Sequence, residues 1–276
     1  MKVKEIMSSP VYAVTEMDSV ARARNLMMRH KVRGLVVMDG DKIAGIFTST
    51  DLERMLSEQN SARKSEPIDA IPVGEVCTKN VITAPPNTSV ESVAKIMVEN
   101  KLNHVPIVEK EIVGVVSKTD IIRYASTVPS DFRVGDFATG KVVSANVNHT
   151  INHIISEMEK NSVQKVIIKN NDDEPVGIVS TKDLTADYLV DIVGRRENNR
   201  SRKQRNASLF VPFVAEDIMT GITVIDLGDS VSNAAKKMYD NQISSIPVTK
   251  QKKVIGLFTV DDLVKAVSES EDSEAF

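Results

Sequence analysis

The sequence predicts an α/β protein built from four copies of one β-α-β-β-α unit. The first observation is a heptad that occurs four times, at residues 45–51, 114–120, 177–183 and 256–262. It consists of a glycine, two apolar residues, a hydroxyl residue, two variable residues and an aspartate. The second and third observations are a helical apolar pattern and a pair of short β-branched runs, which precede every heptad. Such a repeat decides the architecture of the whole chain.

Each copy begins with a short amphipathic lead. The leads start at Val3, Val73, Val134 and Ala215, and each is followed by a short β-rich stretch, as in VITA at 81–84. These stretches predict the first strand of each unit.

A helix follows in each copy, predicted by apolar residues at i, i+3, i+4 and i+7, which form one helical face. The second copy shows the pattern in full at Val90, Val93, Ala94 and Met97, whereas the first copy has Arg24 at the i+4 place. We interpret the methionine as core packing, because an unbranched thioether fills irregular gaps.

Two apolar runs then predict adjacent strands, as in GLVV from Gly34 and KIAGIF from Lys42. The heptad ends the second of these strands, and a second helix begins there, as in DLERML from Asp51. One unit of about 55 residues is too small to be comfortably stable alone. We therefore expect the units to pair.

Composition narrows the classes of function. The 276-residue chain has a net charge of −3, without the basic excess of a dedicated nucleic-acid-binding protein. The single cysteine, Cys77, excludes an intrachain disulfide and a multi-cysteine metal site. No run approaches the roughly 20 apolar residues that cross a bilayer, and the first residues do not resemble a signal peptide. A cytoplasmic location without membrane association is expected.

Catalytic motifs are missing from the sequence: it has no Gly-rich phosphate loop, nucleophile elbow or paired acid–base carboxylates. His149 and His153 have the spacing of helical metal ligands, but His149 precedes the expected N-cap Thr150, so the pair should not share a helical face. We predict neither an enzyme, nor a cofactor, nor a metal site.

Two interpretations of the heptad compete. A Ser or Thr N-cap with an acidic residue three places later is a capping box, which satisfies free backbone donors at a helix start. Alternatively, the aspartate accepts hydrogen bonds from a ribose while the helix N-terminus attracts phosphate. One helix start can do both.

The order of elements and the heptad resemble the cystathionine beta-synthase (CBS) domain, from Val3 to about Val267. In that family two repeats form a Bateman module, with adenosine-containing ligands in the clefts between them. Four repeats without a catalytic domain resemble the gamma subunit of AMP-activated protein kinase and its stand-alone prokaryotic relatives. The resemblance implies two Bateman modules, copy one with copy two and copy three with copy four, in a disc-like arrangement.

The resemblance also implies functional residues. Its ribose-binding aspartates correspond to Asp51, Asp120, Asp183 and Asp262. Its phosphate-binding hydroxyls correspond to Thr48, Thr50, Ser117, Thr119, Ser180 and Thr259, with Lys182 in place of one of them. Polar residues before the middle strand add Arg33, His104 and Lys165 as phosphate contacts. The fourth copy has Asp261 beside its aspartate and no cation, so it is expected to be the weakest phosphate site.

The predicted repeats span residues 1–60, 70–128, 131–192 and 212–268. A flexible linker is expected at 193–211, because GRRENNRSRKQRN at 194–206 is strongly basic, and an acidic tail at 269–276.

The expected function is energy sensing: a regulatory protein binds AMP, ADP or ATP and reports occupancy to an effector protein, with a homodimer also considered. S-adenosylmethionine or a dinucleotide could replace these nucleotides as the ligand, since each presents the same diol. The sequence is also compatible with a nucleic-acid-associated regulator that uses residues 194–206, and with a scaffold in which the aspartates only cap helices.

Overall fold

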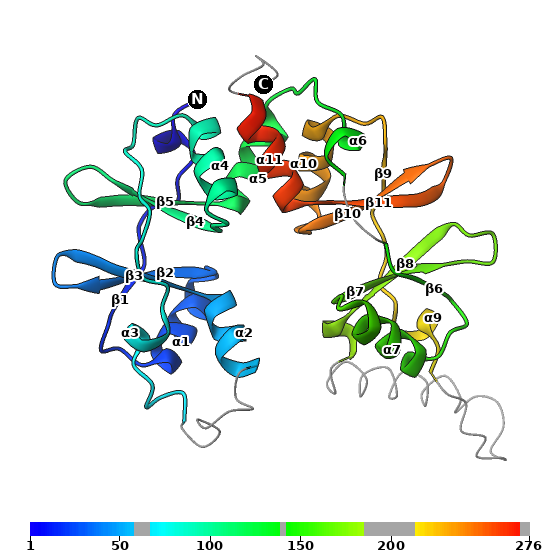
Figure 1. Cartoon of the computed structure of the whole chain (residues 1–276), viewed down its shortest axis with the longest axis horizontal. Coiled ribbons are helices and arrows are strands. Elements are labelled where there is room, and N and C mark those ends of the chain that lie inside the picture. The colour runs from blue at the N-terminus through cyan, green and yellow to red at the C-terminus, as the bar shows by residue number, and fades with distance from the viewer. Residues whose placement is uncertain (58–66, 139–141, 185–212, 271–276) are drawn as a thin grey trace. The chain divides into compact units, whose positions relative to one another are not determined.

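The computed structural model describes residues 1–57, 67–138, 142–184 and 213–270. It divides into two compact units (Figure 1): unit 1 is Met1–Pro129 with the segment from Val264, and unit 2 is Ser130–Leu263. Unit 1 therefore holds repeats one and two, and unit 2 holds repeat three with repeat four up to Leu263, which agrees with the predicted pairing. The disc-like arrangement of the two modules stays a prediction.

Repeat one shows the unit in full. It consists of β1 (Ala13–Thr15), α1 (Val20–His30), β2 (Gly34–Asp39), β3 (Lys42–Thr48) and α2 (Ser49–Ser57). The sheet order is β1-β2-β3, with β1 parallel and β3 antiparallel to β2. A parallel first strand requires the crossover that α1 provides.

The other repeats follow the same order. Repeat two has α4 (Val90–Glu99), β4 (His104–Val108), β5 (Ile112–Ser117) and α5 (Lys118–Thr127). Repeat three has β6 (Ser144–Asn146), α7 (Ile151–Asn161), β7 (Lys165–Lys169), β8 (Pro175–Ser180) and η3 (Thr181–Leu184). Repeat four has β9 (Ile225–Asp226), α10 (Val231–Asp240), β10 (Ser245–Lys250), β11 (Lys253–Thr259) and α11 (Val260–Glu269).

The first strand predicted at 81–84 is reduced in repeat two to one parallel bridge between Ala84 and Ile107. Pro85 and Pro86 follow directly, and because proline has no N–H to donate, the pairing stops there. The sheet of repeat two consequently contains only β4 and β5.

The first helices begin where the sequence predicts. Ser19, Ser89, Thr150 and Ser230 are their N-caps, and each side chain accepts a hydrogen bond from the N–H three residues later. The predicted apolar face is buried, with Val90, Val93, Ala94 and Met97 all fully buried in α4.

The leads are exchanged between the repeats of each unit. The lead of repeat two forms α3 (Val73–Val76) and lies beside repeat one, where Val73 and Gly74 donate backbone hydrogen bonds to Asp18 and Glu16. The lead of repeat one forms η1 (Val3–Glu5) and lies against the start of α4, where Val3 donates to Thr88. Figure 1 shows both, with α3 near α1 and η1, in dark blue, near α4.

Unit 2 repeats this exchange. In repeat four, Val134 of α6 (Val134–Phe137) donates its N–H to Asp229. In repeat three, Ala215 of α9 (Ala215–Ile218) donates its N–H to His149. The exchanged leads complete the cores: Ile71, Val73 and Cys77 join the core of repeat one, and Ala215 and Ile218 join that of repeat three.

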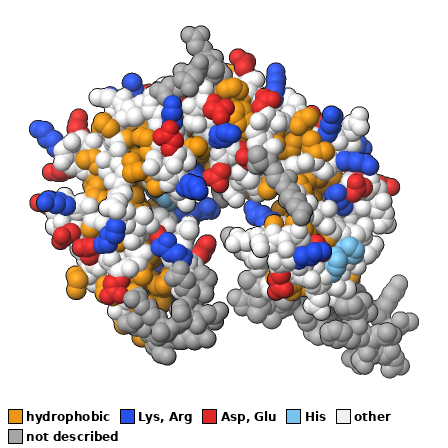
Figure 2. All heavy atoms as spheres, viewed as in Figure 1, with side chains coloured by type: hydrophobic (Ala, Val, Ile, Leu, Met, Phe, Trp, Pro, Cys, Tyr) orange, Lys and Arg blue, Asp and Glu red, His pale blue; other side chains and the backbone are white. Residues whose placement is uncertain are grey.

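Charged residues of both signs share the surface. Over the viewed face of unit 1, basic side chains stand beside acidic ones (Figure 2). Within the described ranges, no helix has the length and apolar character needed to cross a membrane.

Candidate functional site

All four heptads form the same hydrogen-bonded helix start. One carboxylate oxygen of the aspartate, Oδ2, accepts from the backbone N–H and the hydroxyl of the Ser or Thr three places earlier. The hydroxyl–carboxylate distances are 2.7 Å for Thr48–Asp51, 2.6 Å for Ser117–Asp120, 2.7 Å for Ser180–Asp183 and 2.7 Å for Thr259–Asp262. Three of the hydroxyls also accept from the aspartate's own N–H. The reciprocal capping box is therefore complete in repeats one, two and four, and in repeat three Asp183 makes the carboxylate half of that box.

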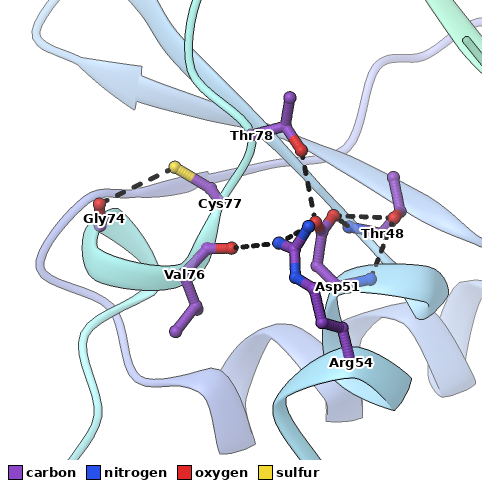
Figure 3. A network of polar contacts seen from close by, with 7 residues as sticks. All are labelled: Thr48, Asp51, Arg54, Gly74, Val76, Cys77 and Thr78. Carbon is purple, nitrogen blue, oxygen red and sulfur yellow. Dashed lines mark hydrogen bonds and ion pairs between the residues drawn. The ribbon is translucent and has the colours of Figure 1, made fainter. Parts of the chain in front are cut away.

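The heptad aspartates of unit 1 are buried charges with further partners, and Figure 3 shows those of Asp51. Asp51 is 4% exposed, and its second oxygen, Oδ1, accepts from Arg54 at 2.8 Å and from the Thr78 hydroxyl at 3.2 Å. Thr78 belongs to the lead of repeat two, so the bond joins the two repeats. The Arg54 guanidinium also reaches the Val76 carbonyl oxygen, in the same lead, at 3.4 Å.

Repeat two contains the same network. Asp120 is 6% exposed, and its Oδ1 accepts from Arg123 at 3.0 Å and from the Ser8 hydroxyl at 3.2 Å. Arg123 also donates to the Ile6 carbonyl oxygen at 2.5 Å. Buried carboxylates need such partners to offset their lost hydration.

These arginines and lead hydroxyls were not predicted from the sequence. A signal for the arginines was present, because DLER and DIIR both place an arginine three residues after the aspartate, one helical turn away. The hydroxyls gave no local signal, since Thr78 and Asp51 meet only through the exchange of leads.

Strand register brings two of the predicted phosphate contacts, His104 and Lys165, beside their heptads, whereas Arg33 precedes its strand. Each hairpin pairs the heptad hydroxyl residue with the first residue of the middle strand: Gly34 with Thr48, His104 with Ser117, Lys165 with Ser180 and Ser245 with Thr259. The first residues of the middle strands also meet across each pair of repeats. The His104 ring packs over Gly34, and Lys165 Nζ donates to Ser245 Oγ at 3.2 Å.

His104 differs chemically from the other phosphate candidates. Its pKa is lowered from 6.5 to about 4, chiefly by burial; Asp120 and Asp51 oppose this shift, while Lys118 and Arg33 add to it. The imidazole is consequently neutral near pH 7. Its Nδ1 is buried without a hydrogen-bond partner in the part of the chain that the structure describes. An orphaned buried nitrogen is costly and needs an explanation such as an absent ligand or water.

Burial varies among the other candidates. Arg33, Thr50, Thr119 and Lys165 are exposed, Asp183 is partly buried, and Asp262 is buried like Asp51 and Asp120. The side chain of Lys182 lies outside the described residues, as do the basic segment 194–206 and the last six residues of the predicted tail.

A polar hollow of about 310 Å³ lies elsewhere, at the end of β7 opposite Lys165, and is lined by His149, Lys169 and Asp173 among others. His149 precedes the N-cap Thr150 as predicted and so lies outside α7, but its ring still packs against that of His153. The two rings lie 4.1 Å apart, edge to face, because His149 turns back and its Nδ1 accepts from the Asn146 N–H. Among the described residues, no three His, Cys, Asp or Glu side chains gather as a metal site would require.

Known proteins share this architecture. MJ1225 of Methanocaldococcus jannaschii is 22% identical over 270 residues, which cover 92% of this chain and 93% of that protein. Its crystal structure, described as that of a proposed archaeal homologue of γ-AMPK, superposes with a TM-score of 0.63 at 21% identity, over 96% of this chain and 99% of that one. An uncharacterised conserved protein of Pyrococcus horikoshii superposes with a TM-score of 0.65 at 19% identity, over 97% of this chain and 100% of that one. At these identities the similarity establishes the fold.

MJ1404, also of M. jannaschii, is 23% identical over 282 residues, which cover 97% of this chain but only 62% of MJ1404. This chain therefore spans less than two thirds of that relative.

The family model of the CBS domain matches residues 3–58, 73–127, 134–189 and 214–269. The four matches cover most of the chain and each contains one heptad, so this protein belongs to the CBS domain family.

Proposed function

We propose that this protein is a non-catalytic regulator that binds adenine nucleotides at the heptads of its paired CBS repeats and reports their occupancy to a partner protein. The observation that supports it most is the register of the hairpins. In every repeat the first residue of the middle strand lies beside the heptad hydroxyl and one turn from the aspartate. One position thus combines an acceptor for ribose hydroxyls with donors for phosphate.

The orphaned Nδ1 of His104 supports a ligand between repeats one and two. It lies within electrostatic range of both Asp51 and Asp120 and is buried without a partner in the described chain. A ligand hydroxyl or phosphate oxygen there would end this unfavourable state. In unit 2 the matching position carries Lys165, whose ammonium suits a more highly charged phosphate chain.

The partner is proposed from the relatives. The description of MJ1225 as a proposed archaeal homologue of γ-AMPK supports a regulatory subunit whose ligand occupancy is sensed by another protein. Occupancy and partner binding would be linked reciprocally, and the shift is limited by the difference in affinity between the two states.

Calorimetric titration of ligand-stripped protein with AMP, ATP and S-adenosylmethionine tests the proposal. We expect AMP or ATP to bind and Asp183→Asn to remove one class of site, whereas the exposed Asp131→Asn control should bind as wild type. If only S-adenosylmethionine binds, the ligand class is wrong and the sensing role stands. If none of the three releases heat or raises the melting temperature, the proposal fails.

A structural scaffold is the second candidate, and one observation favours it: the carboxylates of Asp51 and Asp120 are already fully engaged by their own chain. If the protein is a scaffold, Asp51→Asn lowers the free energy of unfolding, and no nucleotide raises the melting temperature of the wild-type protein. Melting curves of wild type with and without AMP separate the two candidates.

A further inference from the structure

The four hydrogen bonds to Asp51 use the full capacity of its carboxylate. A carboxylate has two oxygens and about four lone-pair positions. Oδ2 accepts from the N–H and the hydroxyl of Thr48, at 2.9 and 2.7 Å, and Oδ1 accepts from Arg54 and Thr78, at 2.8 and 3.2 Å. A sugar diol that bonds to this carboxylate must therefore replace at least one of these donors.

The Thr78 hydroxyl is the donor that a ligand can replace most easily. The Thr48 donors belong to the helix start, so their loss would undo the cap. Arg54 donates a charge-assisted bond and also holds the lead through the Val76 carbonyl, and charge-assisted bonds are roughly twice as strong as neutral ones. Thr78 makes the longest of the four contacts with a neutral hydroxyl, and it is exposed, so water can satisfy it once it is displaced.

The same relationship occurs independently at Asp120. Ser8, from the lead of repeat one, makes the longest contact to this carboxylate at 3.2 Å, beside Arg123 at 3.0 Å. Ser8 is also exposed. Two crossed bonds of one kind, each between the lead of one repeat and the aspartate of the other, point to a shared role.

Unit 2 differs at its matching position. Thr220 occupies the place in the lead of repeat four that Thr78 occupies in repeat two, because each forms a bridge to the residue after the heptad glycine. The Thr220 hydroxyl nevertheless donates to the Ile178 carbonyl oxygen at 3.3 Å. Within the described part of the chain, the carboxylate of Asp183 accepts its hydrogen bonds from Ser180.

We infer that Thr78 and Ser8 are positioning residues that set ligand affinity from the opposite repeat: each competes with the sugar hydroxyls for one oxygen of the heptad aspartate. This inference rests on the proposed function. It follows that a ligand entering at Asp51 removes a contact of the lead of repeat two, so occupancy of one repeat changes the packing of its partner.

The test is calorimetric titration with AMP. Thr78→Val removes the competing hydroxyl at nearly constant volume, and we expect the affinity of one site to rise several-fold, on the order of tenfold at most. Thr78→Ser should restore wild-type affinity, because it restores the hydroxyl. Ser8→Ala should raise the affinity of a second site in the same way.

Thr220→Val is the matched control and should leave every affinity unchanged, since its hydroxyl bonds a carbonyl. The gain from Thr78→Val should also vanish in the Asp51→Asn background, which assigns it to that carboxylate. A valine variant that binds AMP unchanged or more weakly overturns the inference, and so does an equal gain from Thr220→Val. If wild type itself binds no AMP, the proposed function fails and this inference fails with it, whereas AMP binding without an effect of Thr78 overturns the inference alone.

Discussion

Gly45 of repeat one lies directly against Cys77 of the lead of repeat two, so that a Cβ added to Gly45 would stand 2.6 Å from the sulfur. The same Cβ would stand 2.9 Å from the backbone oxygen of Thr78, which cannot rotate away. The glycine that opens the heptad is thus required by the lead of the other repeat. Gly114 and Gly177 show the same closeness to Met7 and Met219.

Gly45→Ala should therefore destabilise the protein by about 1–3 kcal/mol, the usual cost of overpacking. Urea unfolding measures the loss. Gly256→Ala is the matched control, because its nearest described neighbour is 3.9 Å away, an ordinary contact distance. If the two variants had equal urea midpoints, the lead of repeat two would shift to accommodate the methyl group at Gly45 without a loss of stability.

Asp51→Asn should lower the free energy of unfolding by about 1–3 kcal/mol, because the amide offers donors where Thr48 and Arg54 also donate. Asp131→Asn, at an exposed position, should change it by less than about 0.5 kcal/mol. Chemical denaturation at pH 7 is the measurement. If Asp51→Asn lost stability but still bound AMP as wild type does, Asp51 would serve only to cap the helix.

His104 predicts a loss of stability in mild acid. Its pKa is about 6.5 in the unfolded chain and about 4 in the folded chain, so stability is complete above pH 6.5 and falls as the pH drops toward 4. The shift corresponds to about 3 kcal/mol at most.

His104→Asn should remove this part of the pH dependence, as measured by urea midpoints between pH 7 and pH 4. His153→Asn, which removes an exposed histidine, should retain it. If the urea midpoints of wild type and His104→Asn changed with pH to the same extent, the buried, neutral state of the ring would be contradicted.

Lys165→Met should weaken ATP binding several-fold and flatten its dependence on salt, because the lysine supplies one cation at the meeting point of repeats three and four. Lys169→Met removes a lysine that pairs with Asp173 at the other end of β7, so ATP affinity should be unchanged. An effect of equal size from both variants would indicate a general charge effect.

Much of the local structure could be predicted because it depends on residues that are neighbours in the chain. The N-caps Ser19 and Ser89, the buried face ending at Met97 and the helix start at Asp51 all depend on contacts within a few positions of the chain. The shortened first strand of repeat two had a local signal as well, in Pro85 and Pro86.

The partners of the candidate site could not be predicted in this way. Apolar spacing shows that Val73 and Cys77 are buried but not which repeat buries them, and the sequence led us to expect each lead at the start of its own unit. The register that sets His104 beside Ser117 and over Gly34 likewise depends on pairing between strands.

By itself, the sequence determined the number of units, their internal order and the four aspartates at helix starts, because each repeat carries its own complete pattern. Only the tertiary structure decided that the leads cross over, that Thr78 and Ser8 saturate the carboxylates of the opposite repeats and that His104 is left neutral, with a nitrogen that has no partner among the described residues. The physical reason is that these contacts join residues distant in the chain. Their energies arise from desolvation and packing, which a local sequence pattern does not predict.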